Sequence, residues 1–405
     1  MHNAYDVLKE RGFIAQCTHE EELRELMSKE KLTFYMGYDP TADSLTAGHL
    51  LTLMAHAHMQ QAGHRLITLM GTGTGMIGDP SDKTDMRQVM TKETVQHHIA
   101  CFKKQFAKFV NYDNGQAIIE ENDWLLDLKL VDFMRDYGVH FSVNRMLAAE
   151  CYKSRLADGL TAFEFTYMLM QAYDFVELYR RYGCTLQLGG SDQWSNIIAG
   201  VELLRKVEKK PAYGLTFTLL TTGDGVKMGK SMAGAIWLDP AKTSPFDFYQ
   251  YWRNTDDSVV IRNLKLLTFL PMEEINQMAT WQGSELNTAK EILAYEITKI
   301  VHGVEEADKA QTAARGLFAK GAELDLASVP CIDIPAGLMI IEVLERMKLI
   351  PSRSEGRRLI TQGGVSLNGT KVTAFDHVVT EADFEDGYLL IQKGKKVYHR
   401  GFLTL

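Results

Sequence analysis

Residues 32–70 read LTFYMGYDPTADSLTAGHLLTLMAHAHMQQAGHRLITLM, and their pattern predicts the architecture of the first half of the chain. Residues 32–38 form a β-prone run, residues 48–62 have helical apolar spacing, and residues 65–70 form a second apolar strand. Strand, helix and strand within about 40 residues indicate a right-handed βαβ crossover in a parallel sheet. Because such sheets bind ligands at the carboxyl ends of their strands, we expect chemistry in the loops 38–49 and 71–83.

The composition is that of an ordinary globular protein. The chain has 405 residues, enough for two or three domains, with 45% hydrophobic and 24% charged residues. Its net charge of -8 excludes a protein that coats nucleic acid over its whole surface. Residues 337–405 hold 10 Lys and Arg against 8 Asp and Glu, so this tail is basic relative to the rest.

The sequence also predicts a cytoplasmic protein. Its five cysteines form no CxxC pair and no His/Cys cluster, which favours free thiols over disulfides or structural zinc. The first residues, MHNAYDVLKERGF, carry charges where a signal peptide needs an apolar core. No apolar run approaches the ~18–20 residues of a membrane span, so we expect no membrane partner.

Further elements follow along the chain. Helical patterns occupy residues 92–109, 128–137 and 163–181, and residues 184–190 predict a third buried strand that leads into a helix capped by Ser191 or Asp192. Residues 240–322 predict a separate helical domain, and a proline-interrupted linker follows it. The tail resumes with a helix and ends in short strands.

Three loops have patterns that suit a nucleotide, and each has an ordinary alternative. GTGTGMIGDPS (71–81) matches neither GxxxxGK[ST] nor GxGxxG and is consistent with a tight strand exit, although Asp79 suits an ammonium or a ribose hydroxyl. QLGGSDQW (187–194) precedes a helix start, where free N–H groups bind anions or Asp192 acts only as a cap. VKMGKS (226–231) is either a solvated charged turn or a cationic clip for a migrating phosphate charge.

The helical segment FTYMLMQAYDF (165–175) carries a polar stripe. Tyr167, Gln171 and Asp174 lie at i, i+4 and i+7, so they project from one face. Polar groups buried without partners cost free energy, so the stripe either faces solvent or lines a polar pocket. The large apolar residues around it favour the pocket.

Taken in order, these motifs resemble those of one family. The chain has GxH after the first strand, GDPS after the second, the Tyr/Gln/Asp helix, GGSDQW and KMGKS. Over essentially its whole length it is similar to the class I aminoacyl-tRNA synthetases, specifically to bacterial tyrosyl-tRNA synthetases. The resemblance implies an α/β fold with a Rossmann-like parallel-sheet catalytic domain that carries the dimerisation helices (1–238). An α-helical anticodon-recognition domain (239–323), a linker (324–336) and a small α+β RNA-binding domain (337–405) would follow.

The resemblance also implies the site residues. The family signatures HIGH and KMSKS read TAGH (46–49) and KMGKS (227–231) here. The expected catalytic residues are His49, Lys227, Lys230, Lys83, Arg87 and Thr46. The expected tyrosine-binding residues are Tyr35 and Asp174 for the phenol, Asp79, Tyr167 and Gln171 for the ammonium, and Gln187. The expected ATP and adenylate residues are Gly37, Asp39, Gly48, His49, Gly190, Asp192, Gln193 and Lys230.

The implied reaction needs positioning and charge rather than a protein nucleophile. The tyrosine carboxylate, already ionised at neutral pH, would attack the α-phosphate of ATP and release pyrophosphate. A terminal adenosine hydroxyl of the tRNA would then take the tyrosyl group. Mg²⁺ is expected to accompany ATP, with no protein metal site and no tightly bound cofactor.

Thr46 departs from the family pattern, which has a histidine at this position. A threonine hydroxyl can donate one hydrogen bond to a phosphate oxygen but cannot become cationic, so we expect an altered ATP contact. A tryptophan-activating enzyme is an alternative that Tyr35 and Asp174 disfavour. An RNA-binding protein that has lost catalysis and a nucleotidyltransferase that does not act on tRNA are further alternatives.

The expected partners are tRNA(Tyr), L-tyrosine, ATP and a second copy of the chain. The resemblance implies a homodimer through helices between about residues 125 and 155. Basic residues of the tail suggest RNA binding, although a solvated charged face stays open as the alternative. These residues are Arg346, Lys348, Arg353, Arg357, Arg358, Lys371 and the run 393–396.

Overall fold

The computed structural model describes residues 3–79, 90–228, 230–231, 234–318, 329–385, 387–394 and 397–404. Lys83 and Arg87 lie outside these residues. The chain forms two compact units, Met1–Leu45 with His49–Leu220, and Thr46–Gly48 with Thr221–Leu405. None of the described helices has the length and hydropathy that a membrane span requires.

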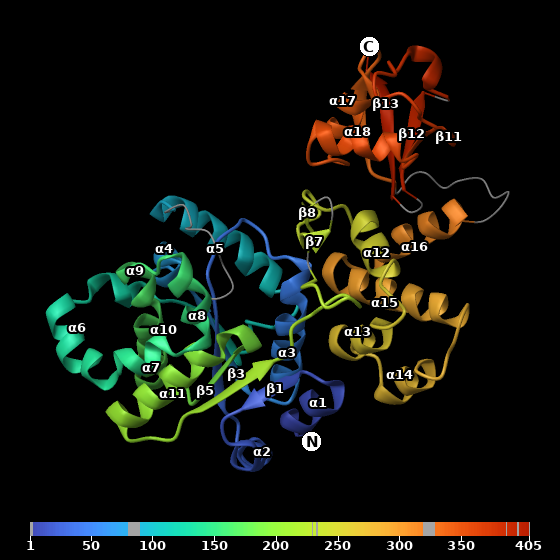
Figure 1. Ribbon diagram of the computed structural model, residues 1–405. Helices are drawn as coiled ribbons and strands as arrows, with labels where there is room; N and C mark the ends of the chain where they lie inside the picture. Colours follow the sequence, from blue (N-terminus) through green and yellow to red (C-terminus); the bar gives the residue numbers. More distant parts are fainter. Residues whose placement is uncertain are drawn as a thin grey trace. The chain divides into compact units, whose positions relative to one another are not determined.

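A six-stranded sheet organises the first unit (Figure 1). Its order is β1-β6-β5-β2-β3-β4, and only β1 runs antiparallel to its neighbour. The predicted crossover is confirmed, because β2 and β3 pair in parallel with α3 between them in sequence. The strands are β1 Ile14–Cys17, β2 Thr33–Tyr38, β3 Arg65–Met70, β4 Ala117–Glu121, β5 Leu186–Gly190 and β6 Tyr213–Phe217.

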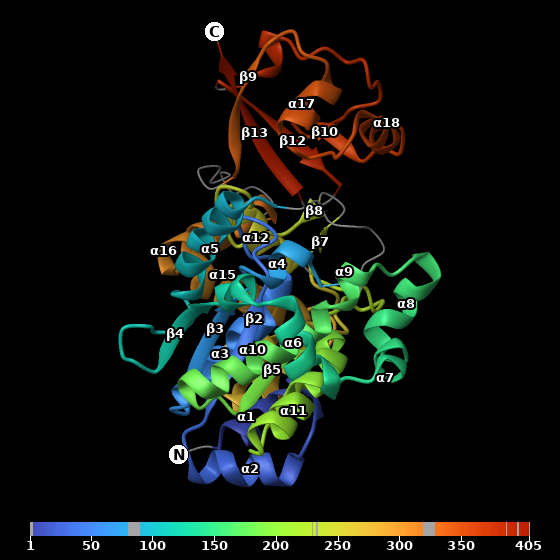
Figure 2. The same cartoon turned by 90° about the vertical axis from the view of Figure 1, so that its left-hand side faces the viewer.

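Helices cover both faces of this sheet. Because alternate side chains of a strand point to opposite sides, β2 contacts a different helix on each face. Phe34 and Tyr38 of β2 meet the ring of His56 on α3, with centroids 6.1 and 5.8 Å apart. Tyr35, between them, meets Phe175 of α10 on the other face, at 5.2 Å. Helices α10 and α11 lie side by side (Figure 2). The helices of the unit are α1 Ala4–Arg11, α2 Glu20–Lys29, α3 Leu50–Gln61, α4 Thr74–Ile77, α5 Lys92–Phe106, α6 Leu130–Asp136, α7 Val143–Leu147, α8 Glu150–Asp158, α9 Ala162–Phe165, α10 Tyr167–Tyr182 and α11 Trp194–Glu208.

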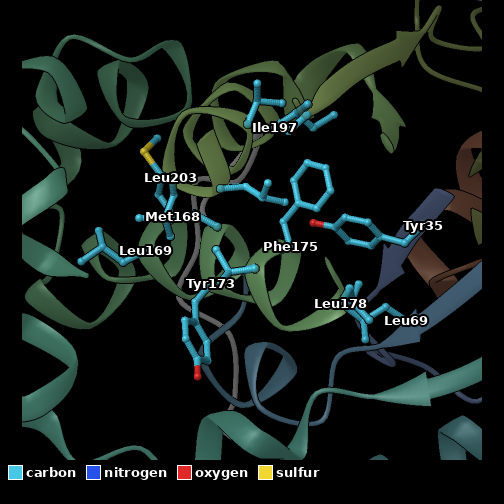
Figure 3. Packing of buried hydrophobic residues seen from close by; sticks show 14 of the residues in the cluster. Tyr35, Leu69, Met168, Leu169, Tyr173, Phe175, Leu178, Ile197 and Leu203 are labelled. Atoms are coloured by element: carbon cyan, nitrogen blue, oxygen red, sulfur yellow. The ribbon is translucent and has the colours of Figure 1, made fainter. Parts of the chain in front are cut away.

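The segment predicted as one helix over 163–181 forms two. Thr161 and Glu164 form a reciprocal capping box at the start of α9, which ends at Thr166. Helix α10 then runs to Gly183, whose φ of 63° supplies the left-handed residue that ends many helices. The core between α10, α11 and the sheet holds Tyr35, Phe175 and Ile197, which Figure 3 shows together.

The second unit contains a helical segment and a small sheet. The segment comprises α12 Pro245–Arg253, α13 Val260–Leu267, α14 Met272–Met278, α15 Glu285–His302 and α16 Val304–Phe318, as the helical pattern predicts, after the short strands β7 Lys230–Ser231 and β8 Gly234–Ala235. The tail forms a five-stranded sheet in the order β11-β10-β12-β13-β9. Its elements are β9 Cys331–Pro335, α17 Ile340–Arg346, α18 Arg353–Thr361, β10 Val365–Leu367, β11 Thr370–Lys371, β12 Tyr388–Lys393 and β13 Val397–Thr404.

We predict that the first unit loses stability in acid because His56 is buried in it. Both ring nitrogens of this fully buried residue lack hydrogen-bond partners among the described residues. Burial lowers the pKa of His56 to about 3, so its contribution to stability is complete above the unfolded value of about 6.5 and is lost as the pH falls toward 3. At pH 5 the loss is at most about 2 kcal/mol.

The substitution His56→Phe removes the titrating group and leaves an aromatic ring between Phe34 and Tyr38. We therefore expect the melting temperature of the variant to fall less than that of the wild type between pH 7.5 and pH 5. Thermal unfolding followed by circular dichroism measures both values. Equal falls in the two proteins would contradict the assignment.

Candidate active site

Two buried polar side chains lie next to each other at neighbouring strands. Tyr35 of β2 and Gln187 of β5 are register partners and are 1% and 2% exposed. Among the described residues, neither the Tyr35 hydroxyl nor Gln187 Oε1 has a hydrogen-bond partner. An unpaired buried polar atom costs about 1–3 kcal/mol, so these two atoms suit a ligand that pairs with them.

Asp174 of α10 supplies a carboxylate to the same buried region. It is 2% exposed and accepts hydrogen bonds from Trp124 Nε1 at 2.8 Å and from Asn122 Nδ2 at 2.9 Å. Burial raises the pKa of Asp174 to about 8, while the two donors oppose this shift. Burial, followed by the charge of Asp174, raises the pKa of Tyr35 well above its ordinary value, so the tyrosine stays a neutral hydroxyl.

Asn122 ties this carboxylate to the loop that follows β3. Its Oδ1 accepts from the backbone N–H of Gly73 at 2.8 Å and from the hydroxyl of Thr72 at 3.2 Å. The same side chain also donates to Thr74 Oγ1 at 3.1 Å. One amide therefore fixes the carboxylate and the loop relative to each other.

A second carboxylate, Asp39, follows β2 directly. It accepts from the hydroxyl of Tyr167 at 3.1 Å and from that of Thr74 at 2.8 Å. Gly71 leaves room for this arrangement, since a Cβ there would lie 2.1 Å from Asp39 Oδ1. Any larger residue at position 71 must displace Asp39.

We predict that Gly71→Ala impairs the reaction and leaves the fold intact. The methyl group would push Asp39 away from Thr74 and Tyr167, so we expect kcat/KM to fall about tenfold or more, because a 1 Å displacement of a positioning group has effects of that order. Steady-state kinetics of the tyrosine activation that the resemblance implies measure the loss of kcat/KM. The variant Gly115→Ala, where φ is 75° and a Cβ would meet nothing within 4 Å, controls for a general loss of stability, because its strain lies in its own backbone and does not involve Asp39. Activity equal to that of the wild type in Gly71→Ala would show that Asp39 needs no fixed position.

A chain of amides reaches the third carboxylate, Asp79. Gln193 Nε2 donates to Asp79 Oδ2 at 2.5 Å, and Gln193 Oε1 accepts from Gln171 at 3.4 Å and from Asn196 at 3.2 Å. Gln171 Oε1 has no hydrogen-bond partner within the described part of the chain. Asp79 thus joins the polar stripe of α10 through Gln193.

Two glycines shape the ends of the central strands. Gly37 is exposed, and a Cβ there would meet nothing within 4 Å, so the face of β2 above Tyr35 is open. Gly190 has no such space, since its Cβ would lie 2.4 Å from Asp192 Oδ1. The first position leaves space for a ligand, and a side chain at the second would displace the Asp192 carboxylate.

In the second unit, the segment 46–48 lies beside the residues that follow KMGKS. Thr46 forms an antiparallel bridge with Trp237, and Ala47 donates to the Ile236 carbonyl at 2.8 Å. A Cβ on Gly48 would lie 3.2 Å from the Met228 carbonyl oxygen. The fold of the second unit therefore brings residues 46–48 of the first signature beside Met228 of the second.

Of the other signature residues, His49 belongs to the first unit, and Lys227 and Lys230 belong to the second. His49 precedes α3 in the first unit, and Thr52 donates to its carbonyl at 2.8 Å. Lys227 is exposed and forms an antiparallel backbone bridge with Thr221. Arg262 of α13 donates to the hydroxyl of Thr221 at 3.2 Å. Lys230 begins β7, and Gly229 lies outside the described residues.

Sequence reasoning missed Asn122, Trp124, Thr74 and Asn196. Asn122 and Trp124 follow β4, which the sequence pattern does not predict. Asn196 stands one helical turn after Gln193, and that spacing could have identified it. Among the described residues, no group of three His, Cys, Asp or Glu side chains is placed to hold a metal ion.

Comparisons with known proteins show the family to which the chain belongs. Residues 27–319 match the family model of tRNA synthetases class I (W and Y), and residues 323–400 match the tyrosine–tRNA ligase SYY-like C-terminal domain. The tyrosine–tRNA ligase of Acetivibrio thermocellus is 58% identical over 99% of both chains, and that of Clostridium kluyveri is 57% identical over 99% of both. The chain belongs to the tyrosine–tRNA ligases.

Solved structures of a tyrosyl-tRNA and a tryptophanyl-tRNA synthetase have the same fold. The C-terminally truncated mitochondrial tyrosyl-tRNA synthetase of Aspergillus nidulans is 31% identical, with a TM-score of 0.70 over 78% of this chain and 95% of that one. A tryptophanyl-tRNA synthetase from Encephalitozoon cuniculi bound to tryptophan shares the fold at 14% identity, with a TM-score of 0.57 over 75% of this chain and 86% of that one. The resemblance and the fold class predicted from the sequence are confirmed.

Proposed function

We propose that the protein activates L-tyrosine with ATP and transfers the tyrosyl group to the terminal adenosine of tRNA(Tyr). The observation that carries the choice of amino acid is the buried pair formed by the Tyr35 hydroxyl and the Asp174 carboxylate. A phenol can donate to the carboxylate and accept from the Tyr35 hydroxyl. Phenylalanine lacks the hydroxyl and would leave the Tyr35 hydroxyl unpaired, so we expect it to be a poor substrate.

The other polar clusters would hold the remaining groups of tyrosine. We assign the α-ammonium to Asp79, Gln171 and Tyr167, since the first is a carboxylate and the second has a buried unpaired carbonyl oxygen in the described structure. Asp39, Gln187, Asp192 and Gln193 would surround the carboxylate, ribose and adenylate, with Gly37 leaving the backbone of β2 accessible and Gly190 leaving room for the Asp192 carboxylate.

Activation would proceed by attack of the tyrosine carboxylate on the α-phosphate. His49 and Thr46 would contact the phosphates, and Gly48 would let the adenine approach the backbone. Lys227, Lys230, Lys83 and Arg87 would stabilise the leaving pyrophosphate, mainly in the transition state. Magnesium would arrive with ATP rather than occupy a protein cage, in keeping with its preference for phosphate oxygens and water.

The transfer step would use the rest of the chain. We propose that residues 239–323 recognise the anticodon and that the tail 337–405 binds RNA, separated from them by the linker 324–336. Arg353 and Arg358 on α18 are both more than half exposed while paired with glutamates, so the tail presents cations at its surface. The setting would be the cytoplasm.

A second copy of the chain is the partner that we propose for the first unit. Apolar side chains gather on α6, α7 and the adjacent turn, where Leu130, Val131, Val139 and Val143 are 74%, 76%, 68% and 56% exposed. Such a concentration of exposed apolar residues marks an interface. We predict that Val131→Glu converts a dimer into a monomer in light-scattering measurements, whereas Val226→Glu, at an exposed valine in the second unit, does not. A monomeric wild type would contradict the proposal.

Loading of tRNA tests the function. The full-length protein, incubated with bacterial tRNA, ATP and labelled tyrosine, is expected to give acid-precipitable label that depends on ATP. Labelled tryptophan in place of tyrosine should give none. Loading of tryptophan, or of neither amino acid, would overturn the proposal.

A further inference from the structure

The ring of Trp124 lies between Arg181 and the carboxylate of Asp174, which is proposed to bind the phenol of the substrate. Its guanidinium carbon lies 4.5 Å from the ring centroid of Trp124. Trp124, 8% exposed, donates its only N–H to Asp174 at 2.8 Å. Asp174 and Arg181 are seven residues apart on α10 and therefore share a helix face. Helix α10 thus supplies both ends of an Arg181–Trp124–Asp174 stack.

We propose that Arg181 is a positioning residue for tyrosine selection, acting on Asp174 through the indole of Trp124. The proposal rests on the proposed function, because it concerns the side chain assigned to the phenol. A cation over an indole face is attracted by the electron-rich ring. It draws electron density away from the ring nitrogen, which makes the N–H a stronger donor to the carboxylate. It also fixes the ring plane on which that hydrogen bond depends.

The charges around Asp174 explain why a strong donor is needed. Burial is the main cause of its raised pKa, and the negative charges of Asp39 and Glu177 add to it. The hydroxyls of Tyr35 and Tyr167 are also close enough to interact with it electrostatically. Asn122 and Trp124 are the donors that oppose these effects. Weakening the Trp124 donor therefore favours the protonated carboxyl, which is a poorer acceptor for a phenol.

Arg180 provides a matched control for the stack. Both arginines pair with Glu177 at 3.3 Å, so both reduce the negative charge that Glu177 presents to Asp174. Arg180, however, lies over the ring of Tyr137 at 5.9 Å and not over Trp124, and it also pairs with Glu208 at 2.8 Å. A comparison of the two separates the route through Trp124 from the route through Glu177.

The experiment compares the full-length wild type with Arg181→Met, Arg181→Lys and Arg180→Met in ATP–pyrophosphate exchange with tyrosine and with phenylalanine. Methionine covers the indole without a charge, and lysine keeps the charge. For Arg181→Met we expect the tyrosine KM to rise about three- to tenfold with little change in kcat, and kcat/KM for phenylalanine to stay constant. Arg181→Lys should recover most of the tyrosine KM, and Arg180→Met should stay within about twofold of the wild type.

Several outcomes would overturn the proposal. An unchanged tyrosine KM and an unchanged ratio of tyrosine to phenylalanine kcat/KM in Arg181→Met would show that the stack does not act on Asp174. An equal rise in Arg180→Met would assign the effect to Glu177 instead. In both cases the wild type still activates tyrosine, so the proposed function stands. A wild type that does not activate tyrosine overturns the proposed function, and this proposal with it.

Discussion

Replacing Asp174 by asparagine is expected to lower kcat/KM for tyrosine by roughly a hundredfold or more. The amide has no charge and can accept from only one of Trp124 and Asn122, so it offers the phenol a weaker acceptor and leaves a buried donor facing an NH₂ group. Disrupting a buried hydrogen bond to a charged group has an effect of this order. Exchange kinetics with tyrosine measure the loss.

The same variant should fold at least as well as the wild type at pH 8. The pKa of Asp174 is raised in the folded chain from 3.8 to about 8, so between these values the folded chain keeps the proton that the unfolded chain loses, and stability falls as the pH rises. Asparagine has no such cost. Asp308→Asn, at an exposed carboxylate that accepts from Tyr295, is a control with the same chemical change. An active Asp174→Asn, or one that melts well below the wild type at pH 8, would contradict this account of the site.

Replacing Lys227 by alanine should slow tyrosyl-adenylate formation by about 10²–10³-fold and leave the tyrosine KM unchanged. The lysine is proposed to stabilise the pyrophosphate as it leaves, and removing one preorganised group that meets developing charge has effects of this size. Pre-steady-state measurement of adenylate formation gives the rate.

Lys309→Ala is the matched control for this loss of charge. Lys309 lies on α16 and pairs with Glu305 and Glu306 at the surface, so its removal should not change the rate. A normal rate of tyrosyl-adenylate formation in Lys227→Ala would show that Lys227 of the second signature does not take part in this step. A raised tyrosine KM with a normal rate would place Lys227 at the amino acid instead.

The sequence predicts the central strands of the first unit because they are buried on both faces. In β2, β3 and β5 most residues of both faces are buried, as parallel strands between two helical layers require. β1 and β4 cannot be predicted in this way. The former has only four residues with its middle two exposed, and the latter ends in two glutamates. Both lie at edges of the sheet, where water reaches one side.

The site could be predicted where helical spacing or a sequence motif identifies it. The positions of Tyr167, Gln171 and Asp174 follow from the periodicity of one helix. The partners that hold Asp174 do not, because Asn122 and Trp124 are about 50 residues away in sequence and reach it only through the order of the strands. Contacts of this kind depend on tertiary packing, which local patterns do not encode.

Amino-acid-dependent ATP–pyrophosphate exchange tests the central claim most directly. The purified full-length protein is assayed with each proteinogenic amino acid in turn at equal concentration. We predict rapid exchange with tyrosine and none approaching it with phenylalanine or tryptophan. Exchange that tryptophan supports as well as tyrosine does, or no exchange with tyrosine, would contradict the assignment of Tyr35 and Asp174 to a phenol.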